Sequence, residues 1–247
     1  MKAIKLLLIL YAGILLHCSN EFPRIHYTPK EDTGGSGIDL CKGKEGPETK
    51  YCNPEDGQFY DNECIGLSYD KDSSFCDVRD GQIYKFRHIY EQIWMAQNLN
   101  YDNKRAADSR CYEDENMDDS CNEYGRFYNW EAASGICPPG WHLPSREEWV
   151  RLRDNVGRIY TKVAEALKAT YGWNSYNGDD NYGFSALPGG YCTLYSCSNA
   201  KIAGMWWTGR EMNNQEAYHF WIDNNGTTSI MNTLKVNLIP VRCVKDN

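Results

Sequence analysis

The sequence lacks the residue spacings of the common metal sites. None of its 11 cysteines forms a C-x-x-C pair, and no two of its five histidines are spaced i, i+4. Zinc sites in proteins are usually built from such closely spaced ligands. We therefore expect no zinc site and no cofactor.

The chain also lacks an excess of positive charge. Its Lys and Arg residues number 26 and its Asp and Glu residues number 34, which gives a formal net charge of -8. A phosphate backbone repels such a surface, and no basic stripe in the sequence offsets the repulsion. We therefore expect no nucleic-acid partner.

No apolar run is long enough to cross a bilayer comfortably. The run from Leu6 to Leu16 follows Lys2 and Lys5, as the apolar region of a signal peptide follows its positively charged region. It has no small-x-small cleavage site. It ends in Leu15-Leu16-His17-Cys18, which resembles the lipobox of bacterial lipoproteins except at His17.

This ending predicts that residues 1–18 are a lipoprotein-type signal peptide and that Cys18 is the lipidated residue. The lipid anchor would make the outer membrane a partner, and we expect an outer-membrane or cell-surface lipoprotein, or otherwise a secreted protein. Removing Cys18 from the 11 cysteines leaves ten. This even number suits five disulfides in an oxidising compartment.

Two segments precede the main domain. Residues 19–40 are polar and contain Gly34-Gly35-Ser36-Gly37, which predicts a flexible linker. Residues 41–76 have almost no aliphatic side chains, so disulfides rather than a core must hold this small Cys-rich repeat. Sequential pairing is the simplest connectivity, with Cys41 joined to Cys52 and Cys64 to Cys76.

The main domain is predicted to span residues 77–247 and to mix helices with antiparallel strands. Its clearest helix signal is a capping box, Ser145 followed by Glu148, after which Trp149, Leu152 and Val156 recur at helical spacing. Its clearest hairpin signal is Asn225-Gly226. Periodicity and turn signals predict the other elements: strands at 82–86, 93–96, 184–191, 205–208, 217–223, 227–231 and 238–244, and helices at 124–133 and 161–170.

An acidic loop lies between Cys111 and Cys121, which are candidates to pair with each other. Asp114, Asn116 and Asp118 alternate along it, as in the first half of a calcium-binding loop. The turn glycine and the distal bidentate glutamate of such loops are absent, so we favour a solvated acidic loop over a calcium site. Cys192 and Cys197 are a further candidate pair that would close a small loop.

Five sequence blocks occur together in the main domain. They are residues 93–101 (IWMAQNLNY), 124–130 (YGRFYNW), 137–149 (CPPGWHLPSREEW), 183–191 (GFSALPGGY) and 241–246 (VRCVKD). In this order they closely resemble the Fibrobacter succinogenes major paralogous domain family, over about residues 78–247. More distantly, residues 143–149 and Arg242-Cys243 are similar to blocks of the formylglycine-generating, sulfatase-modifying group.

The resemblance implies an α+β fold of the C-type lectin-like kind. Two helices would pack on twisted antiparallel sheets with long loops, and disulfides would tie the domain together. In that arrangement Cys137 would pair with Cys243.

The candidate catalytic residues have structural explanations. The formylglycine-generating enzymes use a cysteine pair upstream of their last structural cysteine, and no cysteine lies between Cys197 and Cys243. Ser145 is better used as a helix cap, and Cys137 as a disulfide partner. Glu147 and Glu148 are adjacent on a helix and point about 100° apart, so they do not converge on a glycosidic bond. We therefore predict no catalytic residue and no enzyme.

Ligand binding is the preferred function. The calcium-binding motifs of C-type lectins, Glu-Pro-Asn or Gln-Pro-Asp and Trp-Asn-Asp, are absent from the sequence. Sugars also stack on aromatic side chains without calcium, and the long loops of this fold provide binding surfaces. The candidate stacking residues are Trp173, Tyr176, Tyr182 and Trp207, and the loop at 172–183 is the favoured place for a ligand.

Three hypotheses follow from these observations. The preferred one is an exported, surface-anchored and non-catalytic binding or adhesion module, for polysaccharide or for a neighbouring envelope protein. The second is a structural or assembly component of the cell envelope. The third is a hydrolase or modifying enzyme of unrecognised type, which predicts a cleft with clustered titratable groups.

Overall fold

The computed structural model describes residues 50–52, 59–105, 107–112, 120–159 and 162–246, all within one compact unit of residues 37–247. Several predictions concern other residues and lie outside this part: the signal peptide with Cys18, the linker, Cys41, and the calcium candidates Asp114, Asn116 and Asp118. No helix in the described ranges is long and apolar enough to span a membrane.

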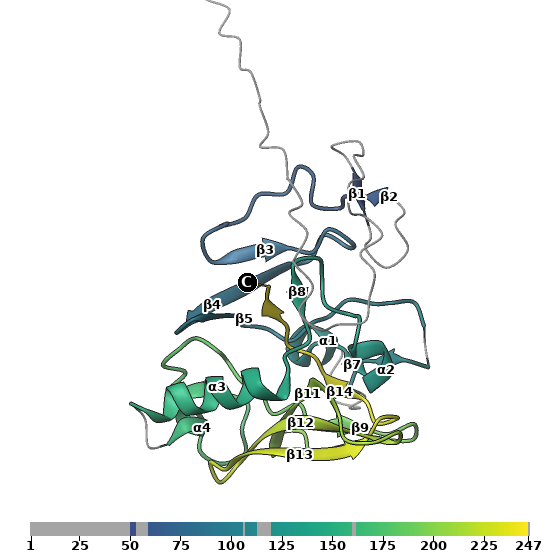
Figure 1. The fold of residues 1–247 in the computed structure, drawn as a ribbon. Helices are drawn as coiled ribbons and strands as arrows, with labels where there is room; N and C mark the ends of the chain where they lie inside the picture. The colour runs from purple at the N-terminus through teal and green to yellow at the C-terminus, as the bar shows by residue number, and fades with distance from the viewer. Residues whose placement is uncertain (1–49, 53–58, 106, 113–119, 160–161, 247) are drawn as a thin grey trace, which may run out of the picture. The chain divides into compact units, whose positions relative to one another are not determined.

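The largest sheet among the described residues joins strands from residues 74–95 to a strand near the C-terminus (Figure 1). Its strands lie in the order β3-β4-β5-β15-β8, and every neighbouring pair is antiparallel. The predicted hairpin at 82–96 is confirmed as β4 and β5. The five strands are β3 (Ser74–Cys76), β4 (Ile83–Ile89), β5 (Gln92–Met95), β15 (Val244–Lys245) and β8 (Trp141–His142).

A second sheet contains the longest strand, β11 (Ala203–Glu211), followed by β12 (Glu216–Asp223) and β13 (Thr228–Leu234). The hairpin predicted from Asn225-Gly226 is confirmed between β12 and β13. Gly226 has φ +85°, a left-handed conformation that glycine adopts without steric cost.

Three smaller sheets complete the described strands. β14 (Ile239–Pro240), β7 (Phe127–Tyr128) and β6 (Ser109–Arg110) form one, β9 (Tyr191–Cys192) and β10 (Cys197–Ser198) another, and β1 (Lys50–Cys52) and β2 (Phe59–Asp61) the third. The described residues also form four helices: α1 (Ser120–Tyr124), α2 (Trp130–Ala133), α3 (Arg146–Gly157) and α4 (Val163–Leu167).

Helix α3 begins at the predicted capping box. The Ser145 hydroxyl accepts a hydrogen bond from the Glu148 amide at 3.1 Å, and the Ser145 amide donates to the Glu148 carboxylate at 2.8 Å. The apolar stripe of Trp149, Leu152 and Val156 is fully buried. The short helix predicted at 161–170 is confirmed as α4.

Three predicted elements are wrong in type or extent. The helix predicted at 124–133 is interrupted by β7, because Gly125 has φ +73° and a side chain there would collide with Asn98. The strand predicted at 184–191 is irregular up to Gly190, with Ser185 at φ 53°. The strand predicted at 238–244 divides into β14 and β15, and Arg242, which lies between these two strands, is fully buried.

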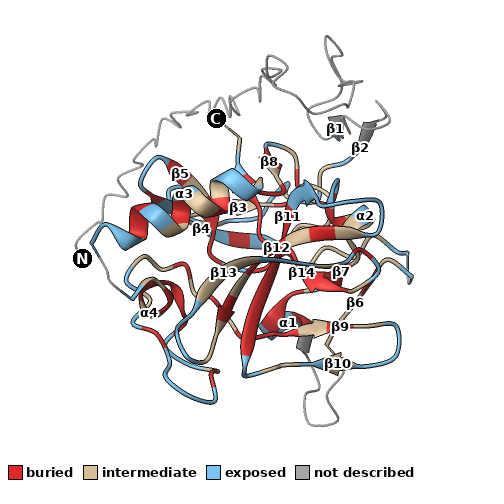
Figure 2. Ribbon diagram, turned by 60° about the horizontal axis from the view of Figure 1, so that its bottom comes forward, coloured by how far each residue is buried: buried red, intermediate tan, exposed pale blue. Residues whose placement is uncertain are grey.

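Two apolar clusters share the β11–β13 sheet. Successive residues of a strand point to opposite faces, so Trp206 packs in the cluster around Trp149 while Trp207 packs in the cluster around Met205. Both tryptophans are fully buried, and Figure 2 shows the buried residues of β11 and of the inner side of α3.

Four disulfides occur in the described part of the chain: Cys64–Cys76, Cys111–Cys121, Cys137–Cys243 and Cys192–Cys197. They match four of the five expected pairs, including the pair that only the family resemblance implied. The fifth, Cys41–Cys52, lies outside the described residues because of Cys41. The fold is therefore α+β and disulfide-bonded, with four described helices where the resemblance implied two.

Candidate functional site

A fully buried arginine connects the C-terminal block to the rest of the domain. Arg242 donates through Nε and Nη2 to the side-chain oxygen of Asn98, at 3.0 and 2.8 Å, and through Nη1 to the carbonyl of Phe184. Its guanidinium lies 4.4 Å from the centre of the Phe184 ring. Burial lowers the pKa of Arg242 to about 9, and the charge of Asp180 opposes this shift.

Asn98 connects the network to further blocks. Its side-chain oxygen also accepts the indole N–H of Trp206 at 2.7 Å, and its amide donates to the carbonyl of Tyr124 at 2.7 Å. Trp149, from the block at 137–149, packs with its ring centre 6.1 Å from those of both Trp206 and Phe184. All five blocks therefore meet around one buried network. This network has the properties of a structural support and not of a ligand site, because its polar groups are satisfied internally.

Cys137, His142 and Ser145 lie close together in the sequence, as a nucleophile and its base could, but they do not form a nucleophilic site. Cys137 is in a disulfide. His142 Nδ1 lies 2.6 Å from a carboxylate oxygen of Asp246, and Nε2 lies 3.0 Å from one of Glu148. Burial alone would lower the pKa of His142, but these two hydrogen-bonded carboxylates raise it to about 9. The imidazolium therefore has no free nitrogen to act as a base, and it joins the C-terminal residues to the start of α3.

The His142 contacts make a prediction about stability at alkaline pH. Since the pKa of His142 is raised from 6.5 to about 9 in the folded protein, its stabilising contribution is fully present below pH 6.5 and is lost as the pH rises through 9. The melting temperature of the wild type should therefore fall more between pH 7 and pH 10 than the melting temperature of His142→Gln. Equal losses in the two proteins would contradict the assignment. His88→Gln, which changes another histidine, is the control.

His219, in the middle of β12, is the second unusual histidine. It is 2% exposed, lies between Trp207 and Trp221, and its ring nitrogens have no hydrogen-bond partner among the described residues. Burial lowers the pKa of His219 to about 4. It is therefore a neutral, aromatic member of the core at neutral pH.

The four aromatic residues proposed for ligand stacking separate into two groups. Trp173 and Trp207 are 6% and 0% exposed, and their indole N–H groups donate to the carbonyls of Ala186 and Tyr128. Both belong to the core, and the sequence pattern did not distinguish them from surface aromatics. Tyr176 is 79% exposed and Tyr182 is half-buried, so these two remain on the candidate surface.

A residue that the sequence did not single out, Tyr90, completes this surface. It lies in the turn between β4 and β5, and its hydroxyl is 3.1 Å from that of Tyr182, with the ring centres 6.0 Å apart. We call Tyr90 and Tyr182 the tyrosine pair. Tyr90 has φ 54°, a conformation that costs a bulky residue about 1–2 kcal/mol and that glycine or asparagine adopts more easily. A tyrosine at a turn position that usually holds glycine or asparagine is the sequence feature that could have identified this residue.

Contacts with Lys168 and Ser185 hold the loop at 172–183 in place. Lys168 donates through its ammonium group to the carbonyl of Tyr176 at 3.3 Å and lies 4.1 Å from the centre of the Trp173 ring. Gly178 packs so closely on the Lys168 carbonyl that a Cβ would approach it to 2.2 Å. Asp180 accepts hydrogen bonds from the amide and hydroxyl of Ser185. The loop therefore presents Tyr176 and Tyr182 on a rigid support.

No group of three or more His, Cys, Asp or Glu side chains suited to a metal ion occurs in the described ranges. The calcium candidates Asp114, Asn116 and Asp118 are not part of those ranges, so calcium there stays a prediction.

These features define a disulfide-bonded α+β domain with tyrosines displayed on supported loops. The sequence model of the Fibrobacter succinogenes major domain family matches residues 88–245 of the chain. The chain therefore belongs to this family. No curated protein and no solved structure matches the chain.

Proposed function

We propose that the protein is an exported, surface-anchored and non-catalytic binding module whose ligand is a polysaccharide. The observation that carries the proposal is the tyrosine pair, in which a strained surface tyrosine is hydrogen-bonded to a tyrosine of the loop at 172–183. Residues with a strained backbone cluster at functional sites, so the strain at Tyr90 motivates a functional hypothesis. Tyrosine rings stack on the apolar faces of sugars, and their hydroxyl groups bind sugar hydroxyls.

Other features of the chain agree with this proposal. The lipobox-like residues before Cys18 and the four disulfides are typical of an exported protein. The family resemblance favours a C-type lectin-like arrangement, in which long loops bind ligands. An enzyme would need accessible titratable groups sharing a cleft, and His142 is instead saturated by two carboxylates while His219 is buried in aromatic side chains.

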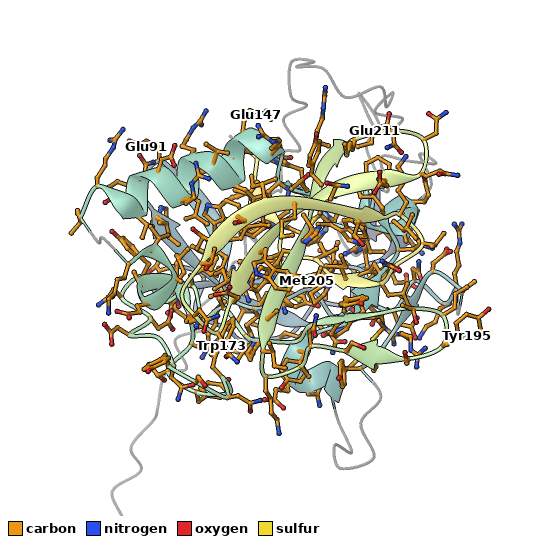
Figure 3. All side chains as sticks on the ribbon, turned by 90° about the horizontal axis from the view of Figure 1, so that it is seen from below. Glu91, Glu147, Trp173, Tyr195, Met205 and Glu211 are labelled. Atoms are coloured by element: carbon orange, nitrogen blue, oxygen red, sulfur yellow. A yellow bond between two sulfur atoms is a disulfide. The ribbon has the colours of Figure 1, made fainter. Side chains whose placement is uncertain are left out.

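A second candidate function, assembly with another envelope protein, has a separate observation in its favour. Leu194 and Tyr195, in the small loop closed by Cys192–Cys197, are 62% and 92% exposed. Figure 3 shows Tyr195 projecting from the body on the side opposite to Trp173 and to Glu91, the neighbour of Tyr90 in the chain. Exposed apolar side chains on a rigid loop suit contact with a protein.

The polysaccharide proposal is tested by removing the tyrosine pair. Binding to cellulose, xylan and chitin is measured by pull-down, and binding to soluble oligosaccharides by calorimetry. We expect Tyr90→Ala combined with Tyr182→Ala to weaken binding roughly 5- to 150-fold, since two stacked rings at about 0.5–1.5 kcal/mol each contribute about 1–3 kcal/mol together. Tyr195→Ala is the matched control and should bind like the wild type.

Two results would contradict the polysaccharide proposal. A well-folded wild type that binds none of these glycans would eliminate the carbohydrate proposal. Binding that is lost on Tyr195→Ala and retained without the tyrosine pair would move the site to the Cys192–Cys197 loop.

A further inference from the structure

Arg87 is a half-buried arginine of β4 that pairs with no carboxylate within the described ranges. Its one side-chain hydrogen bond to a described residue runs from Nη1 to the carbonyl of Phe86 at 2.8 Å and fixes the side chain on the strand. An arginine is charged at every physiological pH, and its guanidinium has several further N–H donors. The remaining donors of Arg87 are therefore left for an acceptor from outside the described chain.

Arg87 lies beside the tyrosine pair. It precedes Tyr90 by three positions in the β4–β5 hairpin, and its side chain packs on Gly183, the residue after Tyr182. A Cβ added to Gly183 would approach Nε of Arg87 to 2.7 Å and Cδ to 3.2 Å, so the arginine occupies the room that glycine leaves. Because the hydroxyls of Tyr90 and Tyr182 are 3.1 Å apart, the same contact between hairpin and loop brings together one cation and two aromatic rings.

The carboxylates close to the tyrosine pair in the sequence do not neutralise this cation. Glu91 accepts a hydrogen bond from the side-chain amide of Asn155 at 3.4 Å. Asp180 accepts from the amide and the hydroxyl of Ser185 at 2.7 and 2.6 Å. Both carboxylates therefore have donors other than Arg87, and the charge of Arg87 is left for a ligand.

We propose that the ligand of this surface is a polysaccharide that carries uronic acid groups. The carboxylate of the acidic sugar would pair with Arg87, and its ring would stack on a tyrosine of the pair. A guanidinium binds a carboxylate through two parallel hydrogen bonds, and tyrosine rings bind the apolar faces of sugars. This inference rests on the proposed function and names the class of sugar that it recognises.

The net charge of the chain limits how densely charged this polysaccharide can be. With a formal net charge of -8, the protein repels a polymer that is negatively charged at every sugar. A single arginine beside two tyrosines suits isolated carboxylates on a neutral backbone. A xylan with scattered glucuronic acid side groups has this chemistry.

Two matched oligosaccharides test the proposal on the wild type. One is a xylo-oligosaccharide with a single glucuronic acid, and the other is the same molecule with its carboxyl group reduced to an alcohol. Calorimetry should show that the acidic form binds about 10- to 100-fold more tightly, the gain expected from a charge-assisted pair of hydrogen bonds. Added salt should weaken the binding of the acidic form more than that of the reduced form.

Variants assign the preference to Arg87. Arg87→Gln should bind the acidic oligosaccharide only as well as the reduced one, and its affinity for the reduced one should equal that of the wild type. Arg151→Gln removes the same charge from an exposed position on α3, and it should bind both oligosaccharides like the wild type.

Equal binding of the two oligosaccharides by the wild type would overturn the uronic acid proposal and leave the polysaccharide proposal standing. An equal loss of acidic binding in Arg87→Gln and Arg151→Gln would overturn the role of Arg87. A wild type that binds neither oligosaccharide also overturns the uronic acid proposal, and its binding to cellulose and chitin then shows whether the polysaccharide proposal fails with it. The comparisons on the wild type require no variant to fold.

Discussion

Replacing Arg242 with alanine is expected to lower the free energy of unfolding by about 4 kcal/mol, because the substitution leaves a large cavity and removes donors from buried acceptors. The carbonyls of Phe184 and Ser185 would lose their hydrogen bonds to the guanidinium. The side-chain oxygen of Asn98 would keep only the indole of Trp206 among the donors of this network. Urea unfolding followed by tryptophan fluorescence and circular dichroism measures the change.

Two further variants identify the cause. Arg242→Met restores most of the volume without the donors, so it should recover only part of the loss. Arg153→Ala removes an arginine from the solvent side of α3, where it pairs with Asp154, and should change stability by less than about 1 kcal/mol. A small effect of Arg242→Ala, similar to that of Arg153→Ala, would show that the buried network does not support the fold.

Removing the Cys137–Cys243 disulfide is expected to have the other large effect. The bond closes a loop with a sequence separation of 106, and the chain-entropy model gives a contribution of about 5 kcal/mol for a loop of this length. The bond also holds β15 next to β8, since both strands flank the paired cysteines. We expect the variant with both cysteines replaced by alanine to unfold at much lower urea concentration than the wild type, with the remaining bonds verified by mass spectrometry.

The Cys192–Cys197 bond is the matched control. Its sequence separation is 5, for which the same model gives only about 2 kcal/mol. If removal of the short-loop bond costs as much as removal of the long-loop bond, loop entropy is not the main source of the stabilisation.

The buried network explains why five separate blocks occur together in this chain. Asn98, Tyr124, Phe184, Trp206 and Arg242 are far apart in the sequence, yet their side chains or carbonyls meet within hydrogen-bonding distance or ring contact. The blocks therefore indicate how the domain is held together. They do not identify its ligand, which is why the proposed binding surface is placed on the tyrosine pair outside them.

The Cys137–Cys243 pair was predicted from the family resemblance, and most of the other confirmed predictions rested on local chemistry. The capping box at Ser145, the Asn225-Gly226 hairpin and the paired spacing of Cys111 and Cys121 each depend on residues close together in the chain. The helix predicted at 124–133 was wrong because its apolar pattern continued through Gly125, whose positive φ is required by close contact with Asn98. Tyr90 was overlooked because its contact with Tyr182 joins residues 92 positions apart.

Sequence patterns were sufficient for the family, the α+β class, the start of α3 and three disulfide pairs, and the family resemblance added Cys137–Cys243. Which aromatic residues are buried became clear from the packing of the folded chain. Trp173 and Tyr176 lie in the same polar loop, but the Trp173 ring packs in the core while the Tyr176 side chain is exposed. The tertiary structure alone placed Arg87 against Gly183 and Tyr90 against Tyr182. Burial and contact between distant residues depend on how the whole chain packs, and no local pattern specifies them.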